Sequence, residues 1–226
     1  MTGPEFWQSF WILAHLLLFA YWLGGDLGVF YASRYRNRGD VDIKTRLLIG
    51  KITAAIDMSP RTTLVLMLPV GLTLAANLGL SPVTGVWLAL VWIASLAWLL
   101  LVWTVHLKKG TERARQFANL DMLIRAAVVV VLTVAAIATF VTGEPFVENW
   151  LALKVLLFAG TVFCGIMIRF AIKPYGVIFE EIVAEGSTPE REARFKSAAK
   201  VSRFWVKSLW ALLLVAAWVG IAKPWF

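Results

Sequence analysis

The sequence predicts an all-α membrane protein with six transmembrane helices, because its composition, the length of its apolar segments and its charge distribution agree. Of its 226 residues, 60% are hydrophobic and 16% are charged, with 12 Trp and 14 Phe. Such a chain has too little polar surface to cover a soluble globular fold. The formal net charge is +8, but the Lys and Arg residues gather between apolar segments, as in cytoplasmic loops. The positive charge therefore indicates topology, and nucleic acid is not expected as a partner.

Six apolar segments are long enough to cross about 30 Å of hydrocarbon, which takes roughly 20 helical residues. We place them at residues 6–31, 58–77, 86–107, 123–142, 150–172 and 204–221. The first has neither a basic start nor a small-residue cleavage site, so we expect a retained helix and not a signal peptide. All six are expected to form a single integral membrane domain over residues 1–226.

The charges of the loops predict the orientation. The loop after the first segment carries six Lys and Arg against two acids, and the loop after the third carries four against one. The loops "NLGLSPVTG" and "GEPFVEN" contain neither Lys nor Arg, so we place them outside, together with both termini. Residues 173–203 mix acids and bases and are expected to form a cytoplasmic or interfacial segment. The predicted location is the bacterial inner membrane.

A repeat relates two pairs of neighbouring spans. Its motifs are "IDMSPR" (56–61) with "LDMLIR" (120–125), and "WLALV" (87–91) with "WLALKV" (150–155). Residues 57–106 therefore align with residues 121–169. Both copies start on the cytoplasmic side, which predicts a parallel duplication of one helical hairpin about an axis along the membrane normal.

Each copy begins with an acid and an arginine spaced i, i+4, at the predicted cytoplasmic end of a span. Such a pair lies on one helix face and can form an ion pair, which makes the entry of a helix into the bilayer tolerable. The alternative is a polar cluster that holds an anionic group or passes protons, with an acid and a histidine from neighbouring helices. Its predicted members are Asp26, Asp57, Arg61, His106, Asp121 and Arg125.

The first span contains the most informative helix face. His15, Trp22 and Asp26 are separated by seven and four residues, so they share one face with Gly25. We expect this face to look inward, because an ionisable group in a bilayer is costly and is a candidate for function. A glycine there lets a flat ligand approach the backbone, although ordinary close helix packing has the same appearance.

Depth in the membrane decides which of these groups can share a site. His15 and Lys154 are both expected in the outer half, within roughly 8 Å of each other in depth at 1.5 Å per residue. His106 lies at the cytoplasmic end of its span, roughly 20 Å deeper than His15 by the same rise. The two histidines are therefore not expected to ligate one haem together, and a zinc or binuclear site is not expected.

Three stretches carry a family resemblance. "HLLLFAYWLGGDLGVFY" (15–31) resembles the first helix of the HemJ-type protoporphyrinogen oxidases, "DMSPR" (57–61) is similar to their Met-Thr-Pro helix entry, and "WLALK" (150–154) resembles their Trp-Leu-His-x-Lys entry. The wider superfamily includes the CopD copper-resistance membrane proteins.

The resemblance implies that His15 binds the metal of haem b, or a porphyrin, and that Lys154 is its functional partner. Trp22 and Gly25 would shape the slot for the ring. Ala152 stands where the HemJ-type proteins have a second His.

Three functions remain open. The first is a haem b or porphyrin protein that transfers electrons to a redox partner or acts as a HemJ-like oxidase, so an oxidoreductase activity is left open. The second is CopD-like copper transport, with Met58 and Met122 as soft ligands. The third is an accessory subunit of a larger membrane complex, suggested by tryptophans in the middle of spans, such as Trp98 and Trp210. Membrane lipids are partners in each case.

Overall fold

In the computed structural model, which describes residues 3–224, the chain forms seven α-helices and no strand within that range. They are α1 (Pro4–Arg36), α2 (Ile43–Ile56), α3 (Met58–Asn77), α4 (Gly85–Leu107), α5 (Glu112–Thr142), α6 (Asn149–Glu185) and α7 (Pro189–Ala222). Helices α2 and α3 meet at Asp57 and together make one long unit, so six helical units are long and apolar enough to cross a membrane. The protein therefore has the architecture of an α-helical multi-pass membrane protein, as predicted.

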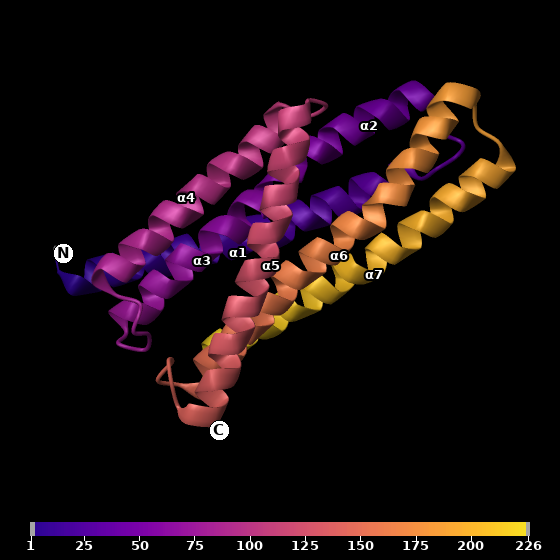
Figure 1. Cartoon of the computed structure of the whole chain (residues 1–226). Helices are drawn as coiled ribbons and strands as arrows, with labels where there is room; N and C mark the ends of the chain where they lie inside the picture. The colour runs from indigo at the N-terminus through magenta and orange to yellow at the C-terminus, as the bar shows by residue number, and fades with distance from the viewer. Residues whose placement is uncertain (1–2, 225–226) are drawn as a thin grey trace.

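The helices run largely along one long axis, and α5 crosses the others at an angle (Figure 1). Helices α6 and α7 form a long antiparallel hairpin, α1 packs on α3, and α5 packs on α6. Both termini lie at the end of the bundle opposite the turn between α6 and α7 (Figure 1).

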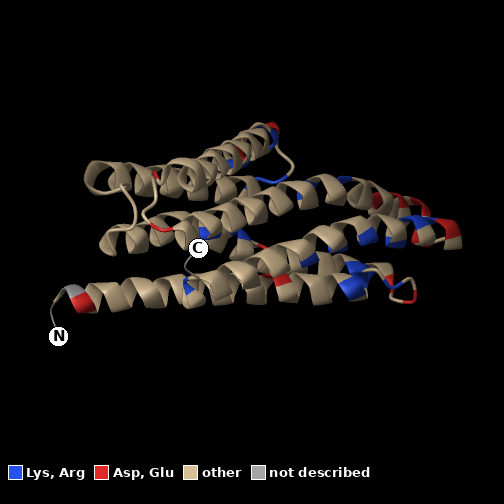
Figure 2. Cartoon of the chain, turned by 90° about the horizontal axis from the view of Figure 1, so that it is seen from below, with Lys and Arg blue, Asp and Glu red and all other residues tan. Residues whose placement is uncertain are grey.

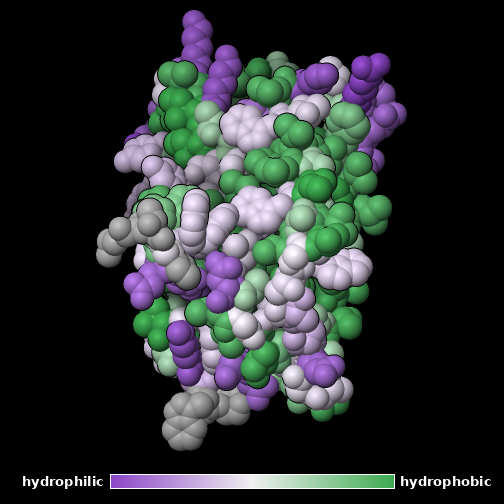
Figure 3. All heavy atoms as spheres, turned by 90° about the vertical axis from the view of Figure 1, so that its left-hand side faces the viewer, coloured by the Kyte–Doolittle hydropathy of each residue, from purple (hydrophilic) through white to green (hydrophobic). Residues whose placement is uncertain are grey.

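Charged residues gather toward the end of the bundle that holds this turn and the α1–α2 loop, and the opposite half carries few of them (Figure 2). Large apolar side chains are exposed along the helices, among them Trp87, Leu100 and Trp218. Figure 3 shows hydrophobic side chains over much of one face, with hydrophilic ones mainly toward its edges. Lipid is the medium that covers such a surface.

The predicted spans coincide with parts of the helices, but α5, α6 and α7 each extend well beyond them. Residues 173–203, expected as a cytoplasmic or interfacial segment, form the end of α6, a turn and the start of α7. Gly186 ends α6 with φ 91°, a backbone conformation that favours glycine. Thr188 then starts α7, because its side chain accepts a hydrogen bond from the Arg191 N–H at 3.3 Å.

Residues 43–56, expected only as a connection, form α2. The Asp42 side chain caps this helix by accepting a hydrogen bond from the Thr45 N–H at 2.9 Å. The same hydrogen bond lowers the pKa of Asp42 below its usual range, since it favours the charged carboxylate.

Helix α1 approaches α3 closely at Gly25. A Cβ at Gly25 would lie 2.7 Å from Cδ of Pro60 and 3.2 Å from Cβ of Ser59, whereas a Cβ at Gly24 would meet nothing within 4 Å. Pro60 thus fills the space beside Gly25 in which we expected a flat ligand from the sequence. The close approach of two helices explains this glycine.

We expect Gly25→Ala to lower the free energy of unfolding by about 1–3 kcal/mol, because the added methyl group overpacks the contact with Pro60. Gly24→Ala is the matched control, and we expect it to be neutral or slightly stabilising, because alanine favours a helix. Thermal unfolding of both variants in one detergent measures the difference. Equal stability of the two variants would show that the contact at Gly25 is loose.

Candidate functional site

The bundle holds two polar sites at different depths, and the first is formed by His15 of α1 and Lys154 of α6. The His15 ring faces α3, where a Cβ at Gly71 would lie 3.6 Å from His15 Cε1. His15 Nδ1 is buried and has no hydrogen-bond partner. Lys154 lies close enough to act electrostatically on His15, and its Nζ packs against Gly220 of α7. The structure thus brings together the two residues that the sequence placed at one depth.

His15 and Lys154 have no acidic partner among the ion pairs of the described residues. Lys223, which follows α7, acts electrostatically on Lys154, and its Nζ lies 5.8 Å from the centre of the Trp150 ring. Within residues 3–224, no ion pair involves His15, Lys154 or Lys223. A buried cationic group without a counter-charge is costly. The site therefore suits a ligand that brings negative charge.

The second site is built around the carboxylate of Asp121 on α5. Trp98 of α4 donates its indole N–H to Oδ1 at 2.7 Å, and Arg125 Nε donates to both oxygens at 3.2 Å. Arg169 of α6 forms an ion pair with Oδ2 at 2.5 Å. Asp121 and Arg125 are only 1% and 2% exposed. One buried carboxylate is thus held by donors from three helices.

The equivalent pair of the other copy is more open. Asp57 and Arg61 form an ion pair whose side chains are 30% and 36% exposed. Both residues act electrostatically on Arg125, so the two pairs lie near each other. The two ion pairs therefore lie near each other but differ in burial.

Asp26 joins this polar group from α1. It lies close enough to Asp57 and to the Trp22 side chain to interact with both, and its Oδ2 is buried without a hydrogen-bond partner. Asp26 is thus the member of the cluster whose charge is least compensated.

His106 is the one predicted member that the structure does not connect to this cluster. Its ring packs on Trp103, with 6.3 Å between ring centres. No hydrogen bond or ion pair in the described part of the chain joins it to the acids and arginines of the cluster.

Sequence reasoning missed Arg169 and the donor role of Trp98. The repeat contained the necessary information, because Arg169 occupies the position in the second copy that His106 occupies in the first. We expected His106 in the cluster because histidine is ionisable, whereas it is Arg169 that contacts Asp121.

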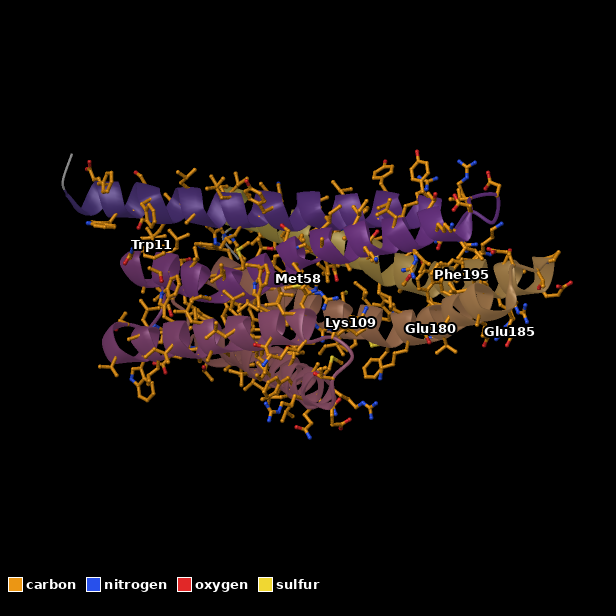
Figure 4. The ribbon with its side chains drawn as sticks, turned by 90° about the horizontal axis from the view of Figure 1, so that it is seen from above. Trp11, Met58, Lys109, Glu180, Glu185 and Phe195 are labelled. Carbon is orange, nitrogen blue, oxygen red and sulfur yellow. The ribbon has the colours of Figure 1, made fainter. Side chains whose placement is uncertain are left out.

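The soft ligands considered for copper are packed among apolar side chains. Met58, Met67 and Cys164 belong to one buried cluster, and Met58 lies inside the bundle in Figure 4. Met122 is half-buried. Among residues 3–224, no group of three or more His, Cys, Asp and Glu side chains is placed to hold a metal ion. This finding does not concern a haem metal, which a single histidine can ligate.

Comparison of the chain with protein-family models, with curated proteins and with solved structures finds no match. The geometry of the two polar sites is therefore the basis for assigning a function.

Proposed function

We propose that this membrane protein binds haem b, or a closely related porphyrin, between α1 and α6. The observation that carries the proposal is the pairing of His15, whose Nδ1 is buried without a hydrogen-bond partner, with the half-buried Lys154, while no ion pair within residues 3–224 involves either residue. A metalloporphyrin complements both, because its metal accepts an imidazole nitrogen and its propionates are counter-ions for an amine. The resemblance of residues 15–31 to HemJ-type proteins supports the same ligand.

The residues present fit such a group. His15 would hold the metal through its ring, and Lys154 would hold a carboxylate. Gly71 and Gly220 make room for these two side chains, since a Cβ at either position would contact them. A bound haem would supply one-electron redox chemistry. The chain itself positions the ring, supplies the counter-charge and keeps the site away from bulk water.

The proposal includes an orientation with both termini outside, which puts His15 in the outer half of the bilayer. The gathering of charged side chains at one end of the bundle supports it (Figure 2), because basic loops stay cytoplasmic. We also propose that residues 57–106 and 121–169 are a parallel duplication. The meeting of their two ion pairs supports this relationship. The bacterial inner membrane is the proposed location.

The test is the dithionite-reduced absorption spectrum of protein purified in mild detergent from haem-replete cells. We expect His15→Ala to abolish the Soret band, because it removes the metal ligand. His106→Ala is the matched control and should keep the band, since His106 contacts Trp103 at another depth. Lys154→Met should weaken haem retention by about ten- to a hundredfold, the usual effect of an outer-shell partner. A wild-type protein without a Soret band would refute the proposal.

An accessory role in a larger complex is the second candidate, and the exposure of α1 favours it. Aromatic side chains such as Trp7, Phe10 and Tyr21 are exposed along this helix. Aromatic residues are enriched where proteins meet. Copurification of a defined membrane partner with a protein that lacks haem would support this function. CopD-like copper transport through Met58 and Met122 stays the third possibility.

A further inference from the structure

A cluster of arginines at the charged end of the bundle carries more positive charge than the acids beside it. Arg36 of α1, Arg46 of α2 and Arg203 of α7 all act electrostatically on Tyr175 of α6, so four helices converge there. Arg46 alone has an acid, because it forms an ion pair with Glu192 at 2.6 Å. Two cationic groups are therefore left over.

Arg36 and Arg203 lack partners for atoms that are buried. The Nε of each is covered and makes no hydrogen bond, and neither side chain forms an ion pair in the described range. The guanidinium carbon of Arg36 lies 4.1 Å from the ring centre of Phe179 and 5.4 Å from that of Tyr175. Aromatic rings attract this charge but offer no oxygen acceptor to its N–H groups.

A third unpartnered donor lies deeper along the same two helices. The Trp210 indole Nε1 of α7 is buried without an acceptor, and its ring packs on Phe30 of α1 at 5.1 Å. Trp210 follows Arg203 by seven residues, which places both on one face of α7 about 10 Å apart along its axis. The seam between α1 and α7 thus presents buried donors at two depths.

The nearby acids are already engaged or face elsewhere. Glu181 pairs with Arg194 and Glu185 pairs with Arg191. Glu180 and Glu185 lie on the side of α6 turned away from α1 (Figure 4). Within residues 3–224, no acid therefore pairs with Arg36 or Arg203.

Position identifies the missing group. Arg36 follows the expected end of the first span by five residues, and Arg203 precedes the last span by one. This is the depth at which lipid phosphates lie, and arginine binds phosphate oxygens in a bidentate manner. We propose that the α1–α7 seam binds one anionic phospholipid of the inner leaflet, with its phosphate on Arg36 and Arg203 and its ester region toward Trp210.

A phospholipid headgroup and free phosphate both carry a phosphate oxyanion, so the experiment must distinguish these two ligands. The full-length protein in mild detergent is titrated with phosphatidylglycerol, phosphatidylcholine or inorganic phosphate, and bound lipid is counted by native mass spectrometry while thermal unfolding is followed in parallel. We expect one tightly bound phosphatidylglycerol and a higher Tm, about tenfold weaker binding of phosphatidylcholine, and no effect of phosphate.

The variant Arg203→Gln should lose the preference for phosphatidylglycerol by about tenfold, the effect of one charge-assisted hydrogen bond. Lys207→Gln removes the same charge from an exposed position one turn away and should retain the preference. Arg203→Lys should lose part of it, since the charge stays but the forked donor is gone. Equal losses in the Arg203→Gln and Lys207→Gln variants would overturn the site, because they would indicate diffuse attraction. Stabilisation by inorganic phosphate alone would overturn the lipid as its occupant.

Discussion

Replacing Asp121 with Asn is expected to lower the free energy of unfolding by about 3–5 kcal/mol, because it leaves two arginines in the protein interior without their carboxylate. Arg125 and Arg169 both form ion pairs with Asp121, and Arg125 is almost fully buried. Asn has the same shape as Asp and keeps one acceptor oxygen, so the lost stability measures the contribution of the negative charge. Unfolding in increasing SDS, followed by far-UV circular dichroism, measures it.

Asp57→Asn is the matched control, because it makes the same change in the other copy of the repeat. The side chains of Asp57 and Arg61 are partly exposed, and such pairs contribute about 0.2–1 kcal/mol. We therefore expect a loss of at most about 1 kcal/mol. Similar losses for both variants would show that water reaches Asp121 as it reaches Asp57.

The different burial of the two ion pairs could not be predicted from the repeat. Two similar strings predict similar helix positions, yet Asp57 lies at the junction of α2 and α3, whereas Asp121 lies inside α5, which begins at Glu112. Burial depends on which other helices cover each pair. Asp121 is covered by Trp98 of α4 and Arg169 of α6, and tertiary packing of this kind leaves no local trace in a sequence.

The spans themselves were predictable, because hydrocarbon thickness and hydropathy act locally. Residues 58–77 were expected as a span and form α3 with the same bounds. Helix α2 was missed, since its exposed basic residues resemble a cytoplasmic loop and only Asp42 marks its start. The continuation of α6 and α7 beyond the membrane likewise depends on their packing against each other.

The proximity of His15 and Lys154 followed from depth along two predicted spans. Depth alone could not predict which other residues surround His15 and Lys154, because it does not show how each helix is rotated about its axis. The contacts with Gly71 and Gly220 therefore emerge only from the structure. The same limit applies to the predicted polar cluster, in which Asp26 lies close enough to Asp57 to interact with it, whereas His106 packs on Trp103.

The ion pair between Arg46 and Glu192 links α2 to the start of α7 at the charged end of the bundle. Arg46 donates to the two oxygens of Glu192 at 2.6 and 3.2 Å, and its Nε donates to the Arg36 carbonyl at 2.9 Å. Its guanidinium lies 5.3 Å from the ring centres of both Phe179 and Phe195. Figure 4 places Phe195 of α7 at this end of the bundle. The charged pair thus lies against a small apolar core at this end, formed by Ile178, Phe179, Ile182 and Phe195.

Glu192→Ala is expected to lower the free energy of local opening at this end by about 3–5 kcal/mol, because Arg46 is then buried without a counter-charge. Glu185→Ala is the matched control, since Glu185 pairs with Arg191 at the exposed surface and a loss of at most about 1 kcal/mol is expected. Amide hydrogen exchange of α2 and of the α6–α7 turn measures the effect, because exchange through local opening reports the stability of that region. The transmembrane parts of α3 and α4 should keep their protection in both variants. Unchanged exchange in α2 after Glu192→Ala would contradict the proposed link, because α2 would then be held to the bundle by its connection to α3 alone.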